Sequence, residues 1–196
     1  MRDSGGVTRY YRVAVLVLLS LLLAQSPAGP PGLIWHGAAV HPGCIRELTT
    51  DLADSRPVIA AVDLEGCAKS NRFADAPEVD GRLLRWKQPD AGGRGFFQYE
   101  YLGALSNGVL VVRTAESGGG TGVFQEMLLL RITPSVVIED GARRTRDALT
   151  MAGTESLGDR DRVTITLSGD AVTIKRQEFR GAMGYGPEIT TVRRVQ

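Results

Sequence analysis

The chain has 196 residues, of which 43% are hydrophobic and 23% are charged, and its formal net charge is +1. This length suits one domain with a substantial core, and the near-neutral charge excludes the strong basic footprint of a nucleic-acid-binding protein. The 24 glycines indicate many turns, and turns between short apolar runs favour an all-β architecture.

The first 28 residues have the layout of a secretory signal peptide. Three arginines precede an uncharged apolar run at 13–24, and small or helix-breaking residues follow it. The run is shorter than the ~20 apolar residues that span a bilayer, although an uncleaved anchor is the alternative. We expect residues 1–28 to be a signal peptide that is removed by cleavage after Ala24 or Ala28. The mature chain is then periplasmic or extracellular and has no membrane attachment.

Residues 29–43 are rich in proline and glycine and predict an extended lead-in to a single β-rich domain at 44–196. Ile45, Leu48 and Leu52 recur at helical spacing just after this lead-in, which predicts one short N-terminal helix.

Cys44 and Cys67 are the only cysteines, and in an oxidising compartment two cysteines predict a disulfide. His36 and His41 lie just upstream and raise the alternative of a zinc site. The set lacks the paired ligand spacing of structural zinc sites, so we expect no metal.

Apolar and alternating runs predict an antiparallel sheet centred on residues 95–132. Asn107-Gly108 and Asp140-Gly141 have the composition of tight hairpin turns, and the alternation around Ser168–Asp170 predicts the clearest hairpin. Residues 154–161 are polar and predict a loop. The fold expected is an antiparallel β-sandwich or a small, partly open barrel. The expected strands are 58–64, 82–88, 97–101, 109–113, 124–132, 136–139, 163–167, 172–175 and 189–195.

A glycine-rich loop separates two of these strands, and its residues are Gly118, Gly119, Gly120, Thr121 and Gly122. Successive backbone N–H groups can hold a phosphate, but the Lys-Ser/Thr pair of a P-loop is absent and Val123-Phe124 follow. The remaining hypotheses are a plain hairpin connection and a loop that contacts a partner. We predict the loop as a binding surface.

Arg143 and Arg144 follow the second hairpin turn, with Arg146 close behind. A basic group of this kind can contact an acidic partner, so Arg143 and Arg144 join the predicted binding residues. The alternative is an ordinary solvated face.

No catalytic residue is predicted, because the chain lacks a G-x-S-x-G motif and both histidines lie in the lead-in. We therefore expect an exported, non-catalytic binding or interaction protein of the cell envelope, with a protein or envelope component as its partner and no cofactor or nucleic acid. The alternative is a hydrolase of envelope polymers that uses Asp63, Glu65 or Glu100. A structural subunit of an envelope assembly is a third, weaker hypothesis.

Overall fold

The computed structural model describes residues 32–49, 61–69, 76–88 and 93–196. The predicted signal peptide, residues 1–28, lies outside these ranges. The described chain is mainly β, as predicted, and its antiparallel sheets are not closed into a barrel but face each other as in a sandwich. The strands are β1 (Ile34–Trp35), β2 (Ala38–Ala39), β3 (Ala61–Asp63), β4 (Glu78–Asp80), β5 (Leu83–Lys87), β6 (Phe96–Ala104), β7 (Leu110–Ser117), β8 (Phe124–Glu139), β9 (Ala142–Asp159), β10 (Arg162–Ser168), β11 (Ala171–Phe179) and β12 (Tyr185–Arg194).

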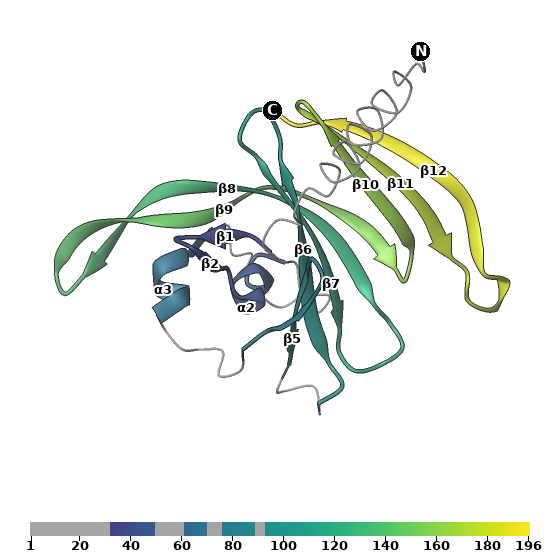
Figure 1. Ribbon diagram of the computed structural model, residues 1–196, viewed down its shortest axis with the longest axis horizontal. Coiled ribbons are helices and arrows are strands. Elements are labelled where there is room, and N and C mark those ends of the chain that lie inside the picture. Colours follow the sequence, from purple (N-terminus) through teal and green to yellow (C-terminus); the bar gives the residue numbers. More distant parts are fainter. Residues whose placement is uncertain (1–31, 50–60, 70–75, 89–92) are drawn as a thin grey trace, which may run out of the picture.

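A seven-stranded sheet with the order β3-β9-β8-β7-β6-β5-β4 forms the centre of the molecule (Figure 1). From β4 to β9 each strand pairs with the next one in the chain, and β3 joins the edge beside β9. Asn107-Gly108 and Asp140-Gly141 make two of the turns, as their composition predicts. Gly108 and Gly141 both have positive φ, which explains why glycine stands there.

A three-stranded sheet, β10-β11-β12, packs against one face of the central sheet (Figure 1). Its β10–β11 hairpin has the predicted register, with Ile165 opposite Ile174. Val172 and Ile174 of β11 bury their side chains against Val111 of β7 and Met127 of β8. The alternating pattern of β10 and β11 therefore provides one inward apolar face and one solvated face.

The N-terminal segment covers part of the other face, where a second core cluster includes Leu33, Ile45, Phe97 and Leu128. The hydroxyl of Tyr99 ties this segment to the sheet, because it donates to the Val40 carbonyl (2.6 Å) and accepts from the Leu33 N–H (3.3 Å). Burial raises the pKa of Tyr99, which keeps the hydroxyl protonated as a donor. Phe97 and Tyr99 are fully buried, so the alternating aromatics of β6 serve the core.

Two short helices, α2 (Pro42–Arg46) and α3 (Leu64–Lys69), lie on this face, where the sequence predicted one. Pro42 is the first residue of α2, and proline fits the first helical position. The His41 Nδ1 atom accepts from the Gly43 N–H (3.0 Å) and so caps the helix. The Cys44–Cys67 disulfide is confirmed, and it joins α2 to α3.

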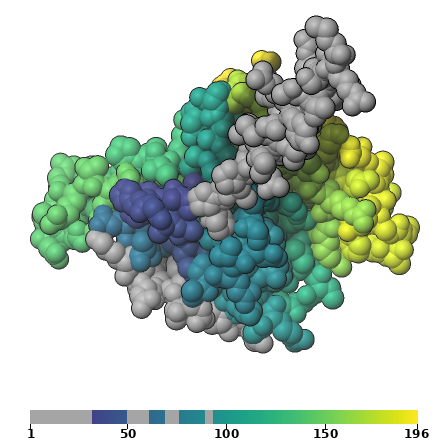
Figure 2. Space-filling view, in the orientation of Figure 1, coloured from purple at the N-terminus to yellow at the C-terminus, as the bar shows by residue number. Residues whose placement is uncertain are grey.

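The distal halves of β8 and β9 form a two-stranded arm that projects from the body (Figures 1 and 2). The prediction of a loop at 154–161 was wrong, because β9 continues to Asp159. Polar side chains hid the strand, which is defined by its backbone pairing with β8. β8 also runs through Pro134, which is compatible with a strand at this point because β7 pairs with β8 only as far as Leu130. Within the described ranges, no helix is long and apolar enough to cross a bilayer.

Candidate functional site

The predicted contact loop, Gly118–Gly122, connects β7 to β8 at the end of the sheet opposite the arm (Figure 1). Gly119 has a φ of +89°, which L side chains rarely adopt. A Cβ atom on Gly122 would lie 2.9 Å from the Phe124 ring. Gly118 and Gly120 face open space. The backbone conformation therefore favours glycine at 119, a side chain at 122 would require the Phe124 ring to shift, and the other two glycines add conformational freedom.

The loop is anchored at its C-terminal end to the turn between β9 and β10. The Val123 N–H donates to the Asp159 carboxylate (2.7 Å), and the Val123 carbonyl accepts from the Arg160 N–H (2.8 Å). The hydrogen bond from Val123, followed by the hydrogen bond and charge of Arg160, holds the pKa of Asp159 below its ordinary value. Gly118, Gly120 and Thr121 are exposed, so the loop presents an open apex on a fixed base.

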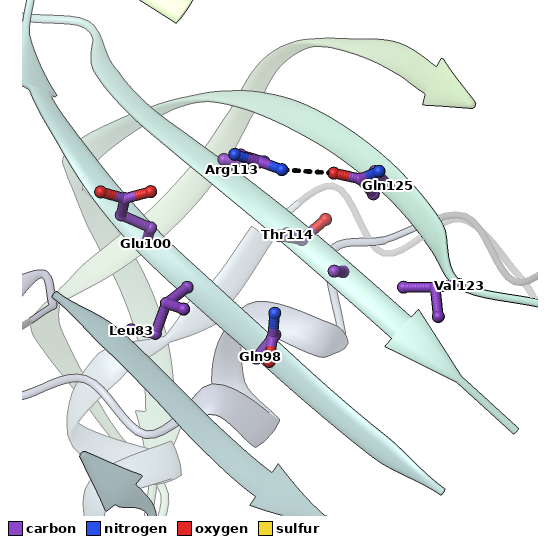
Figure 3. Close-up of a pocket in the computed structure, with 8 residues that line it drawn as sticks. Leu83, Gln98, Glu100, Arg113, Thr114, Val123 and Gln125 are labelled. Atoms are coloured by element: carbon purple, nitrogen blue, oxygen red, sulfur yellow. Dashed lines mark hydrogen bonds between the residues drawn. The ribbon is translucent and has the colours of Figure 1, made fainter. Parts of the chain in front are cut away.

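A hollow of about 250 Å³ adjoins this loop, on the face of the central sheet that carries β10–β12. Side chains from β5 to β8 and from the end of the loop form its walls (Figure 3). The lining residues are Leu83, Gln98, Glu100, Arg113, Thr114, Ala115, Val123 and Gln125. Val123 and Gln125 follow Gly122 in the chain, so the loop and the hollow form one continuous surface.

Arg113 is the charged group that the structure holds most firmly in this hollow. Its Nη2 atom donates to the Gln125 Oε1 atom (2.5 Å), as Figure 3 shows, and its Nη1 atom lies 3.5 Å from the Val163 carbonyl oxygen. Gln125 is only 6% exposed, and its Nε2 atom donates to the Asp161 carbonyl (2.8 Å). Both partners of Arg113 are neutral, and among the described residues no carboxylate forms an ion pair with it.

The rim of the hollow repeats this arrangement on the side of β5. Arg85 donates twice to the Gln98 Oε1 atom, at 2.8 and 2.6 Å, so this guanidinium also binds a glutamine. Glu100 is the carboxylate in the lining, and the Nε atom of Arg82 lies 3.7 Å from it. Glu100 stands opposite Arg113 in the β6–β7 register, but these two residues do not form an ion pair.

The predicted basic residues lie elsewhere, at the tip of the arm. Arg143 and Arg144 follow the β8–β9 turn, whereas Gly118–Gly122 precedes the start of β8. β8 has 16 residues, which corresponds to a strand about 50 Å long at ~3.3 Å per residue. Arg144 pairs with Glu139 (3.3 Å). The structure therefore does not bring the two predicted groups into one site.

The carboxylates of the hydrolase hypothesis are also divided between two places. Asp63 and Glu65 lie 2.8 and 3.5 Å from the Arg146 guanidinium, which contacts Glu139 as well. Glu100 is on β6, four strands away from β3, which corresponds to ~19 Å at ~4.8 Å per strand. Partial burial raises the pKa of Asp63. The hydrogen bonds and charge of Arg146 and nearby backbone N–H groups outweigh this effect, so the pKa lies below its ordinary value.

The two histidines have structural partners in the N-terminal segment. His41 caps α2, and the ring of His36 stacks on Trp35 with 4.1 Å between the centroids. Trp35 in turn donates from its Nε1 atom to Asp147 on β9 (3.1 Å). In the part of the chain that the structure describes, no group of three potential ligands is placed to hold a metal ion.

The chain matches no known family model, no curated protein and no solved structure.

Sequence reasoning located the glycine loop but missed Arg113 and Gln125. The signal in the sequence was slight: a single arginine ends the apolar run VLVVR, and a glutamine follows Phe124. Their proximity depends on the register of β7 with β8, in which Arg113 pairs with Met127 and Ala115 with Gln125. Such a register follows from the sheet as a whole and not from local residue patterns.

Proposed function

We propose that the protein is an exported, non-catalytic binding protein of the cell envelope. Its contact surface consists of the Gly118–Gly122 loop and the adjoining hollow. The observation that carries the proposal is their continuity: Val123 directly follows the loop in the chain, and Val123 is part of the wall of the hollow. Loops on a rigid sheet commonly carry binding, and small-molecule sites are concave with a few fixed polar groups.

Export is supported by the signal-peptide pattern of residues 1–28 and by the Cys44–Cys67 bridge. Structural disulfides persist in oxidising compartments and are rare in the cytosol.

Binding is favoured over hydrolysis by the placement of the carboxylates. A pair of acidic residues that works as acid and base needs one carboxyl group with a raised pKa close to the other. Asp63 has a lowered pKa and is paired with Arg146, and Glu100 lies four strands away. The hollow itself contains one carboxylate, which is half of what such a mechanism requires.

The test is capture of an envelope component by the immobilised mature chain, followed by mass-spectrometric identification. A double variant, Gly118→Gln with Gly120→Gln, places bulky neutral side chains in the open space at the loop apex. We expect it to retain its melting temperature and to capture the same component at least several-fold less well.

The matched control is Thr145→Gln, which adds the same side chain at an exposed position on the arm. It should capture as much as the unaltered chain does. Equal capture by the double variant, or an equal loss in the control, would overturn the assignment of the loop as the contact surface.

A further inference from the structure

We propose that the hollow binds a monoanionic hydroxycarboxylate, with Arg113 holding the carboxylate and Glu100 accepting a hydrogen bond from a hydroxyl group of the same ligand. This inference rests on the proposed function and names the chemistry of the ligand that the site takes.

Arg113 carries a positive charge, and the partners of its guanidinium group are neutral. A guanidinium is a planar fork that matches a carboxylate, and Arg113 is half-buried. Arg113 instead contacts the Gln125 amide and the Val163 carbonyl, both of which are neutral. Its positive charge is therefore available to a ligand in the hollow.

Gln125 holds the Arg113 guanidinium in a fixed orientation. Gln125 is buried and fixed at both ends of its amide, because Oε1 accepts from Arg113 and Nε2 donates to the Asp161 carbonyl (2.8 Å). This connection orients Arg113 without neutralising it. Gln125 is a positioning residue, and its arrangement reduces the entropy that Arg113 loses on binding.

Positive groups outnumber carboxylates in and around the hollow. Arg113 lines the hollow, Arg85 binds its lining residue Gln98, and Arg82 pairs with its lining residue Glu100. The lining itself holds one guanidinium and one carboxylate, and the two further guanidinium groups bound to lining residues make the surroundings of the hollow net positive, which favours a ligand of net negative charge over a neutral or zwitterionic one.

Glu100 selects between anions of different charge. Glu100 lies opposite Arg113 on the neighbouring strand, so a ligand that contacts Arg113 also approaches this carboxylate. A dianion such as phosphate is repelled there, whereas a hydroxyl group can donate a hydrogen bond to Glu100. A monoanion that carries hydroxyl groups satisfies both side chains.

The volume of the hollow limits the size of the ligand. The volume of about 250 Å³ lies below the range of ~300–1,000 Å³ that is typical of sites for drug-sized ligands. The hollow therefore accommodates one small unit, which is either a free hydroxycarboxylate or one sugar-acid unit of a longer polymer.

The experiment is calorimetric titration of the mature chain at pH 8, at which inorganic phosphate is mainly the dianion, with galacturonate, galactose and inorganic phosphate. We expect galacturonate alone to bind, with an affinity that falls as salt is added. Arg113→Gln should weaken galacturonate binding at least about tenfold, because it removes a charge-assisted hydrogen bond. Binding of galactose as tightly as galacturonate, or an unchanged affinity in Arg113→Gln, would overturn the proposal.

Two further variants separate recognition from folding. Arg144→Gln removes an arginine at the tip of the arm and should bind galacturonate as the unaltered chain does. Glu100→Gln should gain affinity for phosphate while it retains its fold, a change of selectivity that a merely structural residue would not produce. Failure of Glu100→Gln to gain phosphate affinity would contradict the role of Glu100.

The linear trimer of galacturonate distinguishes the two sources of the ligand. If the trimer binds more than threefold more tightly than the monomer, the site is assigned to a polymer. If the affinity per unit is equal, the site is assigned to a free acid. The proposed function and this inference also fail separately. If the loop variant captures less of the envelope component but the chain does not bind galacturonate, the ligand class alone is overturned. If the loop variant captures as much as the unaltered chain, the contact surface is overturned.

Discussion

At the scale of single residues, the described arginines differ in what their guanidinium groups contact. Arg146 is surrounded by carboxylates, with Asp63, Glu65 and Glu139 all within 3.5 Å of it. Arg113 and Arg85 bind glutamines instead. The sequence presents Arg143, Arg144 and Arg146 as the conspicuous group, but Arg113, which lines the hollow with only neutral hydrogen-bond partners, lies outside it. Clustering along the chain is thus a poor guide to which charge remains available.

The Asp63–Arg146 pair predicts a pH dependence of stability. The pKa of Asp63 is lowered in the folded chain, so its contribution is fully present above its ordinary pKa of 3.8 and is lost as the pH falls through the folded value. Arg146→Gln should raise the pKa of Asp63 and make stability less sensitive to acid below about pH 4. The measurement is a carbon-13 NMR titration of the Asp63 carboxyl group.

Arg144→Gln is the control for this titration, because Arg144 pairs with Glu139 and not with Asp63. It should leave the Asp63 pKa where it is. A wild-type Asp63 that titrates at or above 3.8 would contradict the pairing.

At the scale of the elements, two patterns in the sequence predicted structure well. The alternation of Val163, Ile165 and Leu167 against Val172 and Ile174 identified the β10–β11 hairpin, because period-2 burial and turn chemistry agree there. The two cysteines identified the bridge between α2 and α3.

Other elements were not predictable from their own residues. The polar end of β9 reads as a loop, yet it is a strand because β8 supplies its hydrogen-bond partners. Leu64 was assigned to a strand but begins α3, where the Asp63 carboxylate accepts from the Glu65 N–H (3.1 Å) and so caps the helix. In both cases contacts beyond the local pattern decide the conformation.

The disulfide makes a testable contribution at this scale. Cys44 and Cys67 are 23 residues apart, and closing a loop of this length stabilises the folded chain by about 3 kcal/mol through lost entropy of the unfolded chain. Reduction should lower the free energy of unfolding by about that amount, as measured by urea denaturation. A Cys44→Ser, Cys67→Ser variant should show no response to the reductant. An unchanged denaturation midpoint of the wild-type chain after complete reduction would contradict this account.

At the scale of the whole molecule, the two faces of the seven-stranded sheet are covered by different elements. One face holds the N-terminal segment, its two helices and the disulfide. The other face holds the three-stranded sheet and, beside it, the hollow with its glycine loop. The candidate site could be predicted only in part from the sequence. The loop is a local pattern, whereas the hollow arises from the registers of β5 to β8.

The central claim is that the loop and the hollow form one binding surface, and NMR shift mapping with galacturonate tests it most directly. The account predicts that the shifts concentrate on the Arg113 guanidinium, the Gln125 side-chain amide and the backbone amides of residues 119–123. Shifts centred on Arg143 and Arg144 at the tip of the arm, or shifts in the hollow with none at residues 119–123, would contradict it.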